Sequence, residues 1–234
     1  MKTSEAPAPD AGIETCPRCM KIMPLCVCDS VKPLKSRVQL LILQHPQEQD
    51  KDLGTARLTA LHFPGSVFKV GLSWPSLSKA LGEQADPKRW AVLYLGSAKP
   101  ADFPEGADVA VLDKAGKPVE FQNSALREIE GVVVLDGTWA QAKTLWWRNA
   151  WMLKCKRIAL RPRQPSLYGK LRKEPRKEAL STLEAVGLLL TRLERRTDIE
   201  AELLKTFGVM LERHKHYQHA LKQAGRAAKA AGET

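Results

Sequence analysis

The amino-acid sequence predicts an α/β fold built on a mainly parallel sheet, and three observations support this prediction. Short apolar segments alternate with segments of helical spacing along most of the 234 residues, as in a succession of α/β units. Residues 132–135 are four consecutive apolar residues, three of them β-branched, which is typical of a strand buried on both faces. This strand ends in Asp136 and Gly137, a turn signal at the carboxyl end, where open α/β sheets bind their ligands.

Each expected element is bounded by its own signals. Pro46 stops the first strand, Gly54 and Pro64 enclose the first helix, and Gly96 closes a later strand. The expected strands are residues 37–43, 66–70, 90–95, 107–112 with a hairpin return at 118–121, 132–135 and 156–160. The expected helices are residues 55–63, 75–81, 124–129, 138–151, 178–194 and 198–223. Residues 186–193 are nearly apolar all round, so this helix should be buried against the sheet.

The composition allows one substantial domain with small additions. We expect a disordered leader at residues 1–15, a small cysteine-containing unit at 16–34, the α/β domain at 35–224 and a frayed basic tail at 225–234. No apolar run approaches the ~20 residues of a membrane span, and residues 1–14 lack the apolar core of a signal peptide. A cytoplasmic protein without a membrane partner is therefore expected.

The chain is basic, with a formal net charge of +11. The excess of Lys and Arg is concentrated in residues 154–176 and 213–229. Such tracts attract polyanions, so nucleic acid is the first partner to consider, and a solvated basic face without a partner is the alternative. The stretch 161–177 combines basic residues with Pro and Gly, as in a phosphate-binding loop.

Four of the five cysteines lie close together near the N-terminus. Cys16 and Cys19 form a Cys-x-x-Cys pair, and Cys26 and Cys28 follow as Cys-x-Cys. Four thiolates at this spacing predict a structural zinc knuckle at residues 16–34. Disulfides are the alternative, but they are rare in reduced compartments. The isolated Cys155 is expected to be a packed thiol.

The residues after the central strand admit two interpretations. A carboxylate at Asp136, Gly137 for close backbone approach and Thr138 at a helix start are placed for chemistry at the sheet edge. Equally, Asp136 and Thr138 can simply cap the following helix. Farther along, Ser181 and Glu184 have the spacing of a capping box.

Tryptophans and histidines leave further alternatives. Trp139, Trp146, Trp147 and Trp151 cannot all share one helix stripe, so some are core and one or two are exposed, where an indole can stack on a base. His45 near Glu48 forms an acid/base pair or hydrogen-bonds its own loop. His214 recurs on the apolar side of its helix. Together with His216 and His219 it is nevertheless expected at a solvated helix end, not in a metal site.

Several motifs in order resemble the DTW-domain family. They are Asp136-Gly137-Thr138-Trp139, Pro165-Ser166-x-Tyr168, Arg172 and Pro175, Leu180-Ser181-Thr182-x-Glu184-Ala185, the cysteine knuckle, His45-Pro46-x-Glu48 and Thr55-x-Arg57-Leu58. The resemblance covers about residues 16–193. One departure is Leu53-Gly54-Thr55, where family members often have Ser-Asn-Thr.

The resemblance implies a function and a fold. Family members are tRNA-uridine aminocarboxypropyltransferases related to the knotted SPOUT methyltransferases. They transfer the 3-amino-3-carboxypropyl group of S-adenosylmethionine to N3 of a tRNA uridine and release methylthioadenosine. A SPOUT-like domain with a C-terminal trefoil knot is therefore expected, although knots are rare in proteins. A monomer is favoured.

The resemblance also implies roles for individual residues. The expected base for the N3 proton is Asp136. Three strand-end loops are expected to wrap S-adenosylmethionine, through Leu95, Gly96, Ser97, Leu135, Gly137, Thr138, Trp139, Ala140, Leu160 and Tyr168. The amino-acid moiety of the donor is expected to bind Arg172 and Glu184, with Ser181 and Thr182 beside them. The tRNA phosphates are expected to bind Lys170, Lys173, Arg176 and Lys177.

Three alternatives stay open at this stage. The protein can be an RNA methyltransferase of the same fold, or its substrate can be ribosomal RNA. It can also be a zinc-knuckle RNA-binding protein without catalysis, in which Asp136 is only a helix cap.

Overall fold

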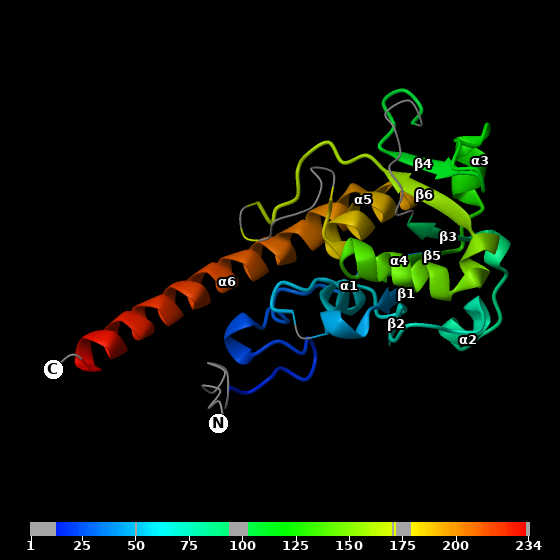
Figure 1. Ribbon diagram of the computed structural model, residues 1–234. Helices are drawn as coiled ribbons and strands as arrows, with labels where there is room; N and C mark the ends of the chain where they lie inside the picture. The colour runs from blue at the N-terminus through cyan, green and yellow to red at the C-terminus, as the bar shows by residue number, and fades with distance from the viewer. Residues whose placement is uncertain (1–12, 50, 94–102, 170, 172–178, 233–234) are drawn as a thin grey trace.

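The structure is a computed structural model that describes residues 13–49, 51–93, 103–169, 171 and 179–232, without the side chains of residues 229–232. The strands are β1 (Gln39–Gln44), β2 (Val67–Val70), β3 (Trp90–Leu93), β4 (Val109–Leu112), β5 (Gly131–Asp136) and β6 (Lys156–Leu160) (Figure 1). The α-helices are α1 (Ala56–His62), α2 (Leu77–Leu81), α3 (Gln122–Arg127), α4 (Trp139–Arg148), α5 (Thr182–Glu194) and α6 (Thr197–Gly232). The 3-10 helices are η1 (Met23–Leu25), η2 (Pro46–Glu48), η3 (Pro87–Arg89) and η5 (Ala150–Lys154).

The six strands form one sheet in the order β2-β1-β5-β3-β6-β4. Every neighbouring pair is parallel except β4 and β6, which confirms the predicted α/β fold with a mainly parallel sheet. All six residues of β5 are buried, as expected for a central strand covered on both faces. Because β1, β5, β3 and β6 run in the same direction, their carboxyl ends lie at one edge.

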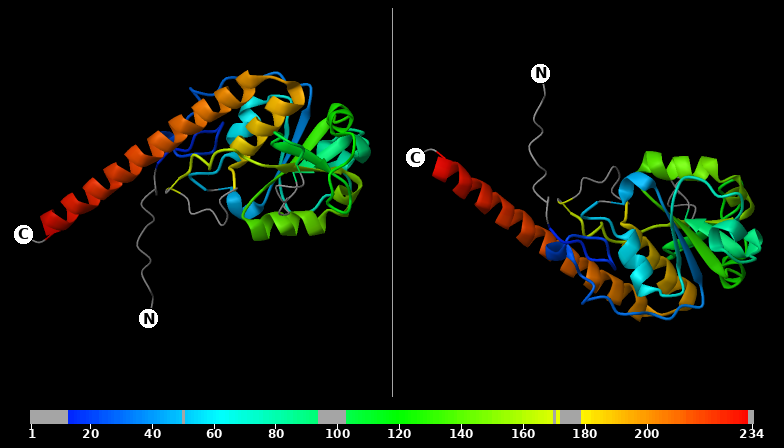
Figure 2. Two further views of the ribbon diagram at one scale, coloured as in Figure 1. Left: turned by 90° about the horizontal axis from the view of Figure 1, so that it is seen from above. Right: turned by 90° about the horizontal axis from the view of Figure 1, so that it is seen from below.

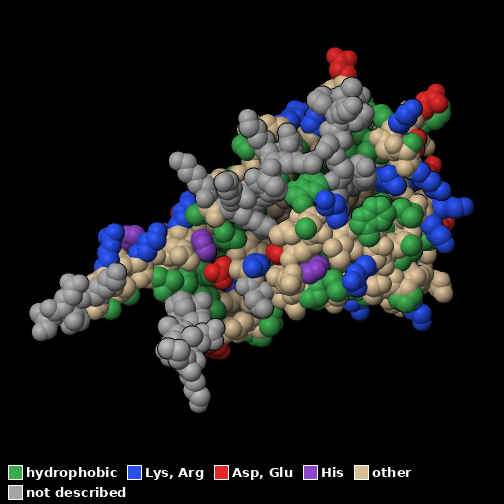
Figure 3. All heavy atoms as spheres, viewed as in Figure 1, with side chains coloured by type: hydrophobic (Ala, Val, Ile, Leu, Met, Phe, Trp, Pro, Cys, Tyr) green, Lys and Arg blue, Asp and Glu red, His purple; other side chains and the backbone are tan. Residues whose placement is uncertain are grey.

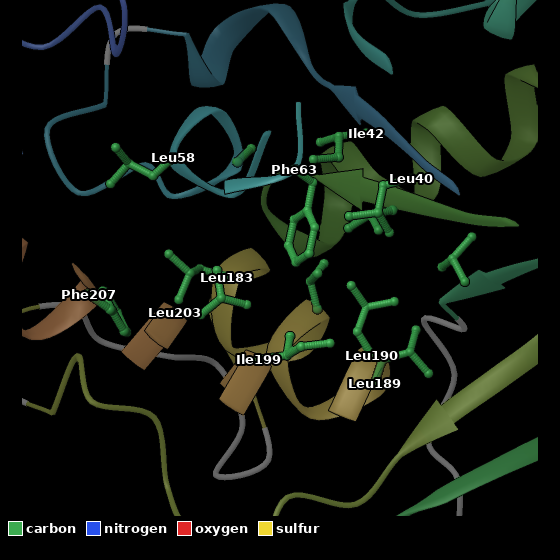
Figure 4. Close-up of a cluster of buried hydrophobic side chains, with 14 of the residues drawn as sticks. Leu40, Ile42, Leu58, Phe63, Leu183, Leu189, Leu190, Ile199, Leu203 and Phe207 are labelled. Atoms are coloured by element: carbon green, nitrogen blue, oxygen red, sulfur yellow. The ribbon is translucent and has the colours of Figure 1, made fainter. Parts of the chain in front are cut away.

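Alternate residues of β5 enter two different cores. Val132 and Val134 pack with side chains of α1, α5 and α6, and Figure 4 shows this core between β1 and those helices. Val133 and Leu135 pack on the other face with residues of α2, α4 and η5. The domain is therefore a sheet between two helical layers.

The helix expected at residues 138–151 is interrupted near its end. Helix α4 ends at Arg148, and the 3-10 helix η5 continues the chain. The buried Asn149 causes this break, since its side-chain amide donates to the carbonyls of Leu72 and Leu145 over 3.0 and 2.7 Å. Its oxygen accepts from the Trp74 N–H over 2.8 Å, so the residue is fixed outside the helix.

Helix α6 continues through Gly225 to Gly232, where the sequence predicted a frayed tail from residue 225. Ala, Lys and Arg predominate there, and their high helix propensity favours continuation. The helix extends well beyond the sheet and its covering layers (Figure 2). Within the described part of the chain, no helix combines the length and apolar character needed to cross a bilayer. The trefoil knot stays a prediction, since the connections 94–102 and 172–178 lie outside the described residues.

Candidate functional site

Asp136 lies at the carboxyl end of β5 and joins three elements. Its Oδ1 accepts a hydrogen bond of 2.5 Å from the hydroxyl of Thr182, the first residue of α5. Its Oδ2 accepts one of 2.9 Å from the side-chain amide of Gln44, which is its register partner in β1. The residue is 9% exposed. A carboxylate is thus held at the expected sheet edge by two neutral donors.

The segment after Asp136 caps helix α4. The Thr138 N–H donates to Gln141 Oε1 over 2.6 Å, and the Gln141 N–H donates to Thr138 Oγ1 over 3.4 Å. A Cβ atom at Gly137 would lie 2.9 Å from Gln141 Cβ, so glycine is needed for this close approach. The predicted capping role of Thr138 is confirmed, whereas contacts of residues 137–140 with a donor molecule stay a prediction.

Glu184 and Ser181 form the second capping box at the start of α5. The buried Glu184 carboxylate accepts from the Ser181 N–H over 2.8 Å, from the Ser166 hydroxyl over 2.7 Å and from the Leu167 N–H over 2.8 Å. These bonds fix the loop after β6 to the first turn of α5. The capping alternative for Ser181 and Glu184 is confirmed, and any ligand ammonium would share a carboxylate that already has three protein donors.

Tyr168 lies in the core. Its hydroxyl donates to the Leu53 carbonyl over 2.6 Å. Its ring meets the edge of the Phe207 ring, with centroids 5.0 Å apart and planes at 88°, a favourable aromatic geometry. Its side chain is 2% exposed, and Leu135 is also buried. These two residues can therefore offer a ligand mainly their backbone.

The structure describes only some of the other predicted site residues. Trp139 and Leu160 are partly buried and Ala140 is exposed. Among the other tryptophans, Trp147 is exposed and Trp151 is buried, which confirms the predicted division. The remaining predicted site residues lie outside the described residues. They are Leu95, Gly96, Ser97, Lys170, Arg172, Lys173, Arg176 and Lys177.

A pocket of about 660 Å³ lies beside the start of α4. It is lined by Gln47, Glu48, Lys51, Asp52, Leu53, Thr138, Gln141 and His214, and its volume is in the range of small-molecule sites. Asp136 is not among these lining residues. His45, next to η2, accepts from the Gln47 N–H through Nδ1 over 3.3 Å, so its hydrogen bond within its own loop is confirmed.

His214 corrects one expectation from the sequence. The side chain lines this pocket, and its Nδ1 is buried without a hydrogen-bond partner among the described residues, so the predicted solvated helix end was wrong for this residue. His216 and His219, in contrast, are exposed. The available signal was the position of His214 on the apolar side of α6, in register with Phe207 and Leu211.

Lys21 is a buried residue near this edge that the sequence did not indicate. Its ammonium group donates to the carbonyls of Asp52 and Lys51. Burial lowers the pKa of Lys21 to about 8, although the charges of Cys19, Asp52 and Asp136 oppose this shift. A lysine in a cysteine hairpin carries no signal of burial, so sequence reasoning could not find this neighbour of Asp136.

The four N-terminal cysteines converge as predicted. Their Sγ atoms all lie within 4.8 Å of one another, and those of Cys16 and Cys28 are 3.8 Å apart. Sulfurs at the usual ~2.3 Å from a tetrahedral zinc ion are separated by about 3.8 Å, so this cluster fits zinc. All five cysteines are free thiols, and a hydrogen bond from the Cys19 backbone lowers the pKa of Cys16 to about 6.

The cysteine knuckle is attached to the main domain. Cys16, Cys19 and Cys28 belong to the same buried cluster as α5 and α6. The Thr206 hydroxyl of α6 donates to the Ser30 carbonyl over 2.9 Å, and Arg213 forms an ion pair of 2.6 Å with Asp29. A metal bound by these cysteines would therefore also stabilise the contacts of the knuckle with residues 206–213 of α6. Cys155 lies in the other core, as predicted for a packed thiol.

Comparisons with known proteins agree with the motifs. The DTW domain family model matches residues 13–215. The tRNA-uridine aminocarboxypropyltransferase 2 proteins of Macaca fascicularis and Mus musculus are 30% and 29% identical over 192 residues, which cover 81% of this chain and 60% of each relative. The Drosophila melanogaster protein of that name is 26% identical over 196 residues, 81% of this chain and 70% of the relative.

The chain thus spans about 60% of the length of the macaque and mouse relatives. No solved structure matches it. The family match covers the cysteine cluster, the whole sheet and α6 as far as Lys215. On this match, the chain belongs to the DTW-domain family.

Proposed function

We propose that this protein transfers the 3-amino-3-carboxypropyl group of S-adenosylmethionine to N3 of a tRNA uridine and releases methylthioadenosine. The observation that carries the proposal is the placement of Asp136 at the shared carboxyl edge of parallel strands, within a chain similar to proteins named for this transfer. Open α/β sheets bind ligands at this edge.

Asp136 is the proposed general base. The uridine N3 carries a proton that must leave before nitrogen can attack carbon, and a carboxylate within hydrogen-bond reach can accept it. The hydrogen bonds from Thr182 and Gln44 fix the orientation of this carboxylate. Its 9% exposure leaves a small part of its surface for a substrate.

The donor contributes an electrophilic carbon next to its sulfonium, and the protein must select which attached carbon reacts. Loop positions around this edge are proposed to make the selection. Glu184 accepts hydrogen bonds from the Ser166 hydroxyl and the Leu167 N–H and so holds this loop in place. Gly137 permits the close turn into α4. Arg172 is proposed to bind the donor carboxylate.

The pocket beside α4 is proposed to receive part of the substrates. It combines acidic, basic and amide side chains with the buried, unpartnered Nδ1 of His214. A buried polar atom without a protein partner is uncommon, and a ligand group or water can satisfy it. His214 is therefore proposed as a residue that positions a substrate near Asp136.

A second candidate function is RNA binding without catalysis. Both Asp136 oxygens accept hydrogen bonds from protein side chains, which favours an anchoring role between β5 and α5. In that case the protein would bind tRNA but would transfer nothing. An RNA methyltransferase would instead transfer a methyl group.

One experiment separates these functions. The full chain is incubated with S-adenosylmethionine and bulk tRNA, and nucleosides and spent donor are analysed by mass spectrometry. Methylthioadenosine with a carboxypropyl-uridine adduct supports the proposal. S-adenosylhomocysteine indicates methylation, and an unchanged donor with bound tRNA indicates binding alone.

A further inference from the structure

The outer half of α6 is a basic helix without a protein core beneath it. The last buried side chain of α6 is Leu211, and residues 212–228 are all exposed or partly exposed. Arg213 and His214 still contact the domain. The helix continues to Gly232, so about 18 residues beyond them, roughly 27 Å of helix, extend from the domain (Figure 2). We call residues 212–232 the α6 arm.

Apart from Arg213, which pairs with Asp29, the described Lys and Arg side chains of the α6 arm lie on one side. Lys215, His219, Lys222 and Arg226 are spaced 4, 3 and 4 residues apart, which places them within about 60° of the helix circumference. Figure 3 shows Lys, Arg and His side chains along one edge of this part of the helix and hydrophobic side chains along the other. The arm therefore carries a basic stripe about 17 Å long.

This stripe is not neutralised within the helix. Residues 213–232 contain no Asp or Glu. Lys215 pairs with the preceding Glu212 over 2.7 Å, whereas Lys222 and Arg226 have no acidic residue within a turn of the helix. Both are exposed. Evenly spaced cations on one exposed side are suited to a phosphate backbone, which is recognised by charge and not by sequence.

The arm begins at the pocket. His214 lines the pocket together with Thr138, and Lys222 and Arg226 follow it by 8 and 12 residues. At about 1.5 Å per residue, these two cations lie roughly 12 and 18 Å along the helix from the pocket. An RNA whose uridine reaches this pocket would therefore have its neighbouring backbone within reach of the stripe.

We infer that the α6 arm binds the phosphate backbone of the folded RNA substrate through Lys222 and Arg226. The inference rests on the proposed function for the identity of that RNA. The family match ends at Lys215, so this binding surface lies beyond the matched domain.

A membrane surface is a weaker fit for the same stripe. Interfacial helices insert bulky apolar residues opposite their basic face. From residue 212 to 228 the arm has only Tyr217 and Leu221 as bulky apolar residues. The arm is otherwise composed of polar residues, Ala and Gly, so RNA is the favoured partner.

The test compares two double variants of the full chain. Lys222→Gln with Arg226→Gln removes two charges from the stripe, and Gln preserves helix propensity. The control, Lys114→Gln with Lys117→Gln, removes two charges from the exposed turn after β4. Strand β4 lies at the opposite end of the molecule from the free end of α6 (Figure 1). Circular dichroism checks that both variants keep the helical content of the wild type.

Binding to bulk tRNA is measured without donor at several salt concentrations. We expect the stripe variant to bind tRNA about tenfold more weakly at low salt. The slope of its log binding constant against log salt concentration should be smaller in magnitude by about 1.4 to 1.8. The control should bind within twofold of the wild type. If the stripe variant binds tRNA as tightly as the wild type, or if both variants lose the same affinity, the inference is overturned. Preferential binding of the wild type to phosphatidylserine vesicles over tRNA also overturns it.

Transfer activity is measured separately, so the two proposals can fail independently. A selective loss of tRNA binding in a protein that forms no uridine adduct supports the arm and contradicts the proposed function. Adduct formation with unchanged tRNA binding in the stripe variant contradicts the arm and leaves the proposed function supported. If both hold, the stripe variant should raise the KM for tRNA and leave kcat unchanged.

Discussion

Asp136 and Thr182 lie 46 residues apart in the chain, and the Thr182 hydroxyl donates a hydrogen bond of 2.5 Å to Asp136 Oδ1. This bond joins the end of the central strand to the first residue of α5. The carboxylate of Asp136 therefore has two separable properties. Its negative charge can accept a proton, and its contact with Thr182 positions a helix. Substitutions can distinguish them.

Asp136→Asn should remove the base and keep the anchor. The amide oxygen can still accept from Thr182, and Gln44 can rotate its amide to present its oxygen to the new donor. Transfer should fall by at least about 100-fold without a change in Tm. Thr182→Val removes the anchoring bond and keeps the charge, so it should reduce turnover less than about tenfold. Equal losses in the two variants would assign Asp136 to anchoring alone.

His214→Ala should weaken the proposed reaction from inside the pocket. The buried Nδ1 has no partner in the part of the chain that the structure describes, and one hydrogen bond to a substrate is worth about three- to tenfold in affinity. We expect kcat/KM to fall by that factor. His216→Ala is the matched control, because His216 lies two residues away and is exposed. A similar effect of both substitutions would argue against a specific contact by His214.

The sequence and the structure agree on features that local sequence signals determine, such as strand positions and helix caps. Strand β6 lies at residues 156–160 as predicted. Thr138 caps α4 and the capping box at Ser181 forms, as their positions indicated. The parallel order β5-β3-β6 places the carboxyl ends of these three strands, which precede the predicted loops, at one edge. Apolar runs, turn residues and cap spacing are sufficient for these features.

Long-range contacts were beyond such reasoning. Gln44 reaches Asp136 across 92 positions, and His214 enters a pocket formed mainly by residues 47–48, 51–53 and the start of α4. No periodicity relates these residues, because tertiary packing brings them together. The end of α4 was likewise set by the distant partners of Asn149, Leu72 and Trp74.

The cysteine cluster should bind one zinc ion per chain. Cys28→Ser should lower the zinc content and also the Tm, since Cys28 belongs to the main buried core and metal binding contributes to folding. Cys155→Ser is the control. Cys155 lies in the other core, and burial raises its pKa to about 12, so this thiol should bind no metal. Metal analysis and thermal denaturation measure both effects, and wild-type protein without zinc would contradict the prediction.

His62 should make the fold less stable in mild acid. The residue is fully buried, its Nδ1 lies 2.8 Å from the Lys32 carbonyl, and burial lowers the pKa of His62 below the ordinary 6.5. At pH values between the lowered pKa of folded His62 and about 6.5, the unfolded chain binds a proton that the folded chain does not bind. The free energy of unfolding should therefore fall as the pH drops below about 6.5, by at most about 1.4 kcal/mol per pH unit from this residue.

Urea denaturation of the wild type and of His62→Gln at pH 7.5 and pH 5.5 measures this contribution. Gln can still donate to the Lys32 carbonyl but does not titrate in this range. Other groups contribute equally to both proteins, so the difference between their pH dependences isolates His62. The wild type should lose more stability than the variant between the two pH values. A parallel loss in both would show that His62 is protonated as readily in the folded chain as in the unfolded one.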